Sequence, residues 1–166
     1  MPGMWWWVGA SLVVGLISAY LIWTAGRVDR LRLRAEAAAR ALEAHLLRRA
    51  AAAAVLAERR YGVELYAAAR IALDAEPEER EAAENDLTRQ LRAVRLDPAD
   101  PECETVIAAS RRLALARQVH TDLVRDARAA RGRPVVRLLR MGRRHPWPRY
   151  FDIDDPTVAL PADVPA

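Results

Sequence analysis

The feature that most constrains this chain is its uncharged N-terminus. Residues 1–26 carry no charged side chain, and most of them are apolar. About 20 residues at ~1.5 Å each cover the ~30 Å hydrocarbon core of a bilayer, so this stretch is long enough for one transmembrane helix. Tryptophans lie near both of its ends, where amphipathic rings favour the two membrane interfaces. We therefore predict a transmembrane segment over 1–26, marked by Met4, Trp5, Gly15, Trp23 and Ala25.

A secretory signal peptide is the alternative interpretation of this segment. Such a peptide carries positive charge before its apolar run and a small-residue cleavage site after it. Here no arginine precedes the run, and Arg27, Arg30, Arg32 and Arg34 follow it. This asymmetry favours an uncleaved anchor. The positive-inside rule then predicts a single-pass protein of the inner membrane, with its N-terminus outside and its body in the cytoplasm.

A stripe of small residues lies along the predicted span. Ser11, Gly15 and Ala19 are spaced four apart, a pattern that lets two membrane helices approach closely. The stripe predicts a homodimer, and the alternative is a lone span that faces only lipid.

The remaining residues hold all 48 charged side chains and are typical of a helical body. Residues 27–75 contain no proline and are rich in good helix formers. A second helix is predicted to begin near Pro77 and to end before Asp97. A third is predicted to run from Pro101 to residue 131 behind Asp100 as its N-cap. The predicted fold class is all-α, a transmembrane helix followed by an antiparallel helical bundle over 27–131 with three long helices.

Gly62 is the one interruption in the first long helix. A chain reversal usually needs two or more loop residues, which favours a kink at Gly62 within one helix over 27–75. The alternative is a true reversal, which would give four helices. On the last helix, Leu113 and His120 lie on the apolar seam, so we expect both to be packed core residues.

The C-terminal part divides into a basic stretch and an acidic end. Residues 132–151 form a predicted basic amphipathic tail, and residues 152–166 are predicted to be disordered because they are rich in proline and aspartate. The tail either docks on an anionic bilayer or an acidic protein surface, or simply caps the bundle. No groove-reading motif points to nucleic acid. The candidate docking residues are Arg137, Arg140, Arg143, Arg144 and Trp147.

Several motifs in collinear order resemble the LemA family. They include His45-Leu46-Leu47-Arg48-Arg49, Ala83-Glu84-Asn85-Asp86-Leu87, Arg111-Arg112-Leu113-Ala114-Leu115-Ala116-Arg117 and the closing Arg149-Tyr150-Phe151-Asp152. Alanines at 51–54 replace the Leu-x-Pro that usually follows the arginine pair in the family, so the chain resembles a divergent member. The resemblance implies a membrane-anchored helical bundle with a cytoplasmic body and no established enzymatic activity.

An enzymatic alternative rests on one short helix. Arg80-Glu81-Ala82-Ala83-Glu84 resembles part of a Nudix box, whose glutamates bind the metal of a diphosphate hydrolase, but Tyr66, Ala72 and Leu87 stand where that motif requires other residues. A motif counts only in its structural context, so we expect these glutamates to lie on a solvated face. The sequence predicts no cofactor and no metal. It favours a non-enzymatic scaffold that recruits unidentified protein partners.

Overall fold

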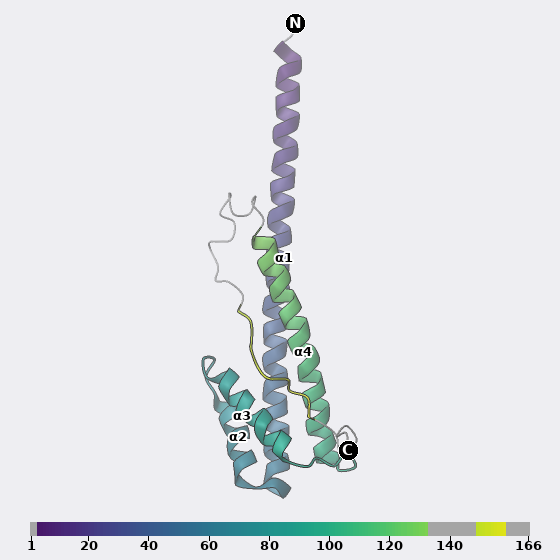
Figure 1. The fold of residues 1–166 in the computed structure, drawn as a ribbon. Helices are drawn as coiled ribbons and strands as arrows, with labels where there is room; N and C mark the ends of the chain where they lie inside the picture. The colour runs from purple at the N-terminus through teal and green to yellow at the C-terminus, as the bar shows by residue number, and fades with distance from the viewer. Residues whose placement is uncertain (1–2, 133–148, 159–166) are drawn as a thin grey trace. The chain divides into compact units, whose positions relative to one another are not determined.

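The computed structural model describes residues 3–132 and 149–158. These residues form four α-helices and one π-helical turn, and no strand is found among them. The elements are α1 (Gly3–Leu56), the π-helical turn (Ala57–Tyr61), α2 (Gly62–Asp74), α3 (Arg80–Ala93) and α4 (Pro101–Arg131), as Figure 1 shows. The all-α prediction is confirmed. The predicted single helix over 27–75 is instead divided between α1 and α2, so the body is built from four helices and not from three.

The described chain divides into two compact units. The first comprises residues 3–36, 123–132 and 149, and the second comprises residues 37–122 and 150–158. The first unit contains the uncharged part of α1, residues 3–26, which we call the apolar head. The two buried apolar clusters of the described residues belong to the second unit. Helix α1 continues through residue 26 without a break, so the apolar segment and the start of the charged body lie on one helix.

The main core of the second unit is built mostly from alanine and leucine. Its buried members come from the end of α1, the π-helical turn, α2, α3, the start of α4 and two connections, which supply Ala75 and Leu96. Alanine side chains let helix backbones approach closely, while each leucine contributes about 1.5–3 kcal/mol of burial. The fully buried leucines of this cluster are Leu56, Leu65, Leu87, Leu91 and Leu96.

The chain reverses at Gly62. Leu65 and Ala68 of α2 lie in the same core cluster as Ala50 and Ala53 of α1, so α2 folds back on the end of α1 (Figure 1). The favoured prediction of a kink within one helix is therefore wrong, and the alternative reversal is what the structure has. The reason is that the turn is not made by one residue. The five-residue π-helical turn widens the end of α1, and Gly62 then takes φ 83° and ψ −178°.

Two ion pairs attach this reversal to the start of α4. Arg59 Nη1 lies 2.7 Å from Glu102 Oε1, and Arg60 Nη1 lies 2.6 Å from Asp100 Oδ2. Asp100 also accepts a hydrogen bond from the backbone N–H of Glu102 at 3.2 Å, which confirms its predicted role as the N-cap of α4. Helix α3 begins at Arg80, three residues later than predicted. The residues before it form a turn in which the Glu79 N–H donates to the Glu76 carbonyl at 3.0 Å.

Substitution of Gly62 should destabilise the fold measurably. Its dihedral angles lie in a region that is essentially restricted to glycine, because a Cβ would clash with the flanking backbone. We expect Gly62→Ala to lower the free energy of unfolding by about 1–3 kcal/mol. Denaturant unfolding followed by circular dichroism tests this, with Val63→Ala as the control because Val63 is 83% exposed. Equal stability of the two variants would contradict the assigned backbone strain.

Residues 150–158 form an extended segment that packs on the helices of the second unit. Ile153 is 3% exposed and shares a small apolar cluster with Leu42, Leu46 and Leu113, and Phe151 packs against it. The segment thus completes a core to which α1 and α4 supply the other buried side chains.

Helix α3 holds the backbone of this segment through side chains. The N–H groups of Asp152 and Asp154 donate to Glu81 Oε1 at 3.1 Å and to Asn85 Oδ1 at 2.8 Å. Arg92 Nη2 donates to the Asp155 carbonyl at 2.6 Å. The prediction that 152–166 is disordered is therefore wrong over 152–158. It rested on the acidic, proline-rich composition, which does not report these hydrogen bonds to α3. Residues 159–166 lie outside the described part.

Candidate functional site

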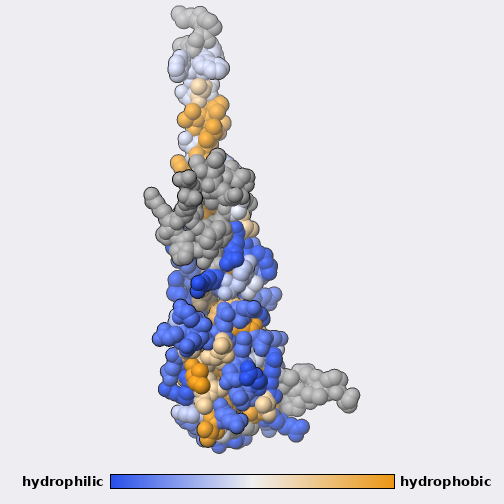
Figure 2. Space-filling model, turned by 60° about the vertical axis from the view of Figure 1, so that its left-hand side comes forward, coloured by the Kyte–Doolittle hydropathy of each residue, from blue (hydrophilic) through white to orange (hydrophobic). Residues whose placement is uncertain are grey.

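The apolar head of α1 is the most distinctive surface in the first unit. Within the described residues, one helix is long and apolar enough to cross a membrane, with a mean hydropathy of 1.8 over 18 residues and only 6% of that window buried. Trp5 is 77% exposed and Trp23 is 54% exposed. Hydrophobic side chains gather along this part of the helix in Figure 2. The core helix of a soluble protein would instead be mostly buried.

The predicted span residues occupy one uninterrupted stretch of helix. Met4, Gly15 and Ala25 all lie in α1. Near the end of the stretch, the rings of Tyr20 and Trp23 lie 6.4 Å apart, and the Arg27 guanidinium stands 5.7 Å from the centre of the Trp23 ring. Such a cation–π pair places the first positive charge directly beside an aromatic ring that favours membrane interfaces.

The small-residue stripe lies on open surface within its unit. Ser11, Gly15 and Ala19 are exposed, and a Cβ added to Gly15 would meet no atom within 4 Å. The homodimer through this stripe stays a prediction.

A buried polar cluster joins α1 to α3 in the second unit. Arg49 and Glu84 each have a relative exposure of 0%. Arg49 Nη1 lies 3.4 Å from Glu84 Oε2, and Arg49 Nη2 donates to Thr88 Oγ1 at 2.7 Å. Thr88 in turn donates to the Glu84 carbonyl at 2.8 Å. A charge-assisted N–H···O bond is usually about 2.7–2.9 Å, so the ion pair itself is long.

Not every polar atom of the cluster has a hydrogen-bond partner, and the pKa values of Arg49 and Glu84 are shifted by burial. Arg49 Nε and Glu84 Oε1 have no hydrogen-bond partner among the residues that the structure describes. Burial raises the pKa of Glu84 to about 7, against the opposing fields of Arg49 and Arg80. Burial also lowers the pKa of Arg49, which Glu84 partly offsets. Near neutral pH, Glu84 thus lies close to the midpoint of its titration.

Sequence reasoning missed this pair, although a signal was present. Arg49 falls three residues after Leu46, at apolar spacing on α1, and Glu84 falls three residues before Leu87 on α3. Two opposite charges at core positions of different helices predict a buried ion pair. The motifs that contain these residues instead supported a family resemblance and, for Glu84, the hydrolase alternative.

The pH dependence of stability should carry the signature of Glu84. Its folded pKa of about 7 lies above the ordinary value of 4.5, so the folded state binds more protons between these two values. Stability should therefore fall by about 3 kcal/mol as the pH rises from about 4.5 through 7. Denaturant unfolding of the full chain across this range, compared with Glu84→Gln, isolates the contribution. His120, whose pKa is lowered by burial, contributes equally to both proteins. Parallel curves would refute the assignment.

The structure also places the residues of the hydrolase alternative. Glu84 is buried against Arg49, so the expectation of a solvated face is wrong for this residue. Glu81 accepts the Asp152 N–H. No group of three His, Cys, Asp or Glu side chains that could hold a metal ion is found in residues 3–132 and 149–158. In this arrangement Glu84 acts as the partner of an arginine.

Of the other candidate residues, some lie in the core and the rest lie outside the residues that the structure describes. Leu113 is fully buried and His120 is 4% exposed, so both are core residues as predicted. Cys103 is buried, and its Sγ lies 3.6 Å from Asp100 Oδ2. The predicted docking residues Arg137, Arg140, Arg143, Arg144 and Trp147 lie outside the described residues.

Comparisons with known proteins returned no match, whether by family model, by curated protein sequence or by solved structure. The resemblance to the LemA family therefore stays a prediction from the sequence motifs.

Proposed function

We propose that this protein is a single-span membrane protein of the LemA type, whose helical body lies at the cytoplasmic face of the inner membrane and recruits or scaffolds partners. The observation that carries the proposal is the head of α1. Its apolar side chains are exposed along the helix, and only 6% of its most apolar window is buried. Contiguous apolar surface of this size is unstable in water and is suited to lipid.

Charge placement supports the proposed orientation. Arg27, Arg30, Arg32 and Arg34 follow the apolar stretch, and no charged residue precedes it. Positive flanks are retained on the cytoplasmic side during insertion. The basic tail over 132–151 would then share a compartment with the anionic leaflet and with acidic proteins, either of which suits its arginines.

A binding role suits the body better than catalysis. The buried ion pair of Arg49 and Glu84 is a structural contact between α1 and α3. The large exposed apolar side chains of the second unit include Val63, Ile71, Leu115 and Val119, which are suited to contacts with other proteins or ligands.

Protease protection tests the membrane topology. We expect the body to be shielded in spheroplasts and digested in inverted inner-membrane vesicles. As a matched control, a variant with Arg27, Arg30, Arg32 and Arg34 changed to Gln, and with two arginines added before Trp5, should reverse this pattern. A mature N-terminus beyond residue 26 would show a cleaved signal peptide, and digestion in spheroplasts would show the opposite orientation. Either result ends the proposal.

A further inference from the structure

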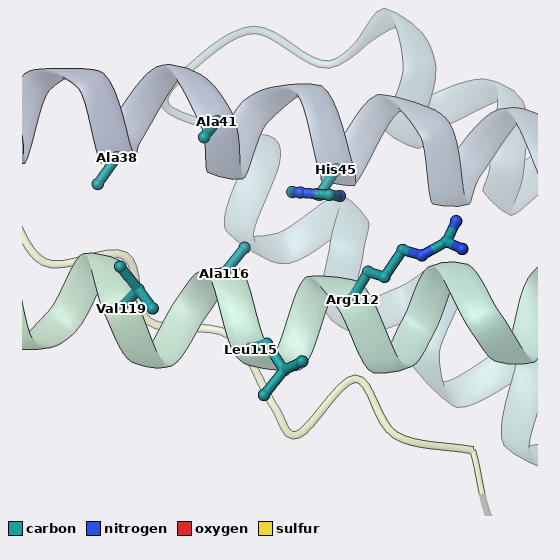
Figure 3. A pocket seen from close by; sticks show the side chains of 7 residues that line it. All are labelled: Ala38, Ala41, His45, Arg112, Leu115, Ala116 and Val119. Carbon is teal, nitrogen blue, oxygen red and sulfur yellow. The ribbon is translucent and has the colours of Figure 1, made fainter.

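An open apolar groove of about 350 Å³ runs between α1 and α4 in the second unit (Figure 3). Helix α1 supplies Ala38, Ala41 and His45, and α4 supplies Arg112, Leu115, Ala116 and Val119. The alanines keep the groove unobstructed, and Leu115 and Val119 are 64% and 55% exposed. The volume lies at the lower end of the range of ligand sites, about 300–1,000 Å³.

The polar groups of the groove are confined to one end. Figure 3 shows His45 and Arg112 together at this end, and Ala38 and Val119 at the other. Both ionisable lining residues are basic, and no acidic side chain lines the groove. The guanidinium of Arg112 can form two parallel hydrogen bonds to a carboxylate.

We propose that this groove binds a free single-chain carboxylic acid, that is, a fatty acid. Its carboxylate would pair with Arg112 and its acyl chain would lie along the alanines toward Ala38 and Val119. The eight residues from Ala38 to His45 span about 10 Å along the helix axis, which suits an acyl chain of medium length. The groove is basic at one end and apolar along the rest. A ligand that complements it carries a negative charge at one end and an apolar chain. The proposal is independent of membrane topology.

Photolabelling of the full chain in nanodiscs of neutral phosphatidylcholine tests this proposal. The probe is decanoic acid with a diazirine at the end of its chain, and labelled sites are mapped by mass spectrometry. Labelling of the apolar head by probe dissolved in the bilayer serves as the internal reference. We expect groove labelling near Ala38 and Val119, and its competition by unlabelled decanoate but not by decyltrimethylammonium.

Variants distinguish specific binding in the groove from non-specific partitioning onto apolar surfaces. Arg112→Gln should reduce groove labelling relative to head labelling by about fivefold, the upper end for an exposed ion pair. Arg111→Gln, the matched control with the same change of charge on the same helix, should leave it unchanged. Ala41→Trp should block the groove while the helical circular dichroism spectrum is retained.

Three results would overturn the proposal. They are labelling of the head alone, equal effects of Arg111→Gln and Arg112→Gln, and equal competition by the cationic amphiphile. An unlabelled groove, together with disulfide-linked dimers of Leu115→Cys in a Cys103→Ser background, would assign the groove to a second copy of the chain.

Discussion

Replacing Arg49 with methionine should lower the free energy of unfolding by about 3–5 kcal/mol at pH 8. The guanidinium is fully buried and lies 3.4 Å from Glu84 Oε2, so its loss leaves a carboxylate without its counter-charge in the core. Methionine fills most of the same volume, which keeps the cavity contribution small. Denaturant unfolding of the full chain in mild detergent measures the effect.

The size of this penalty should depend on pH. Burial raises the pKa of Glu84 to about 7 with Arg49 present, and the variant lacks the positive charge that opposes this rise. Below about pH 5 Glu84 is neutral in both proteins, so the penalty should be smaller there than at pH 8. A penalty that does not change with pH would show that Arg49 contributes through packing alone.

Two further variants complete the test. Arg48→Met removes an exposed arginine from the same helix and should change stability by less than about 0.5 kcal/mol. Arg49→Met combined with Glu84→Leu replaces the whole pair with apolar groups, which is often neutral or stabilising in other proteins. If the double variant is as unstable as Arg49→Met alone, the uncompensated carboxylate is not the cause.

Leu113→Ala should cost about 2–4 kcal/mol of stability. Leu113 is fully buried and, among the described residues, shares its cluster with the buried side chains of Leu42, Leu46 and Ile153, so its truncation leaves a cavity between them. The melting transition of the full chain measures the loss. Leu115→Ala is the control, because Leu115 lies two residues away and is 64% exposed. Equal losses in both variants would mean that α4 presents another face to the core.

The sequence predicted helices and their buried faces well, because apolar spacing reports directly on burial. Ala35, Leu42, Leu46, Ala50, Ala53 and Ala57 follow the apolar spacing of the predicted first long helix, and all are buried. Val28, Leu31 and Ala38 follow the same spacing but are half-exposed, and Ala38 lines the groove instead. The N-cap at Asp100 was also correct, since capping is a local hydrogen-bond pattern.

The errors arise where long-range contacts override local chemistry. A single glycine is usually too short a loop to reverse a chain. The π-helical turn that makes the reversal possible cannot be recognised from the composition of residues 57–61. Arg49 and Glu84 lie 35 residues apart, so neither reveals the other locally. Residues 152–158 have a composition typical of disorder, yet side chains of α3 order their backbone.

The packing of Ile153 also sets the order in which the chain can mature. Its cluster partners Leu42 and Leu46 are synthesised more than a hundred residues earlier, and Leu113 some forty residues earlier. These three leucines therefore emerge from the ribosome before the side chain that completes their cluster exists. Contacts of such long sequence separation form late and slow folding, because a large loop must close first. Until Ile153 has been synthesised, the three leucines lack the side chain that completes their cluster and are exposed to aggregation. A chaperone would be most useful during this interval.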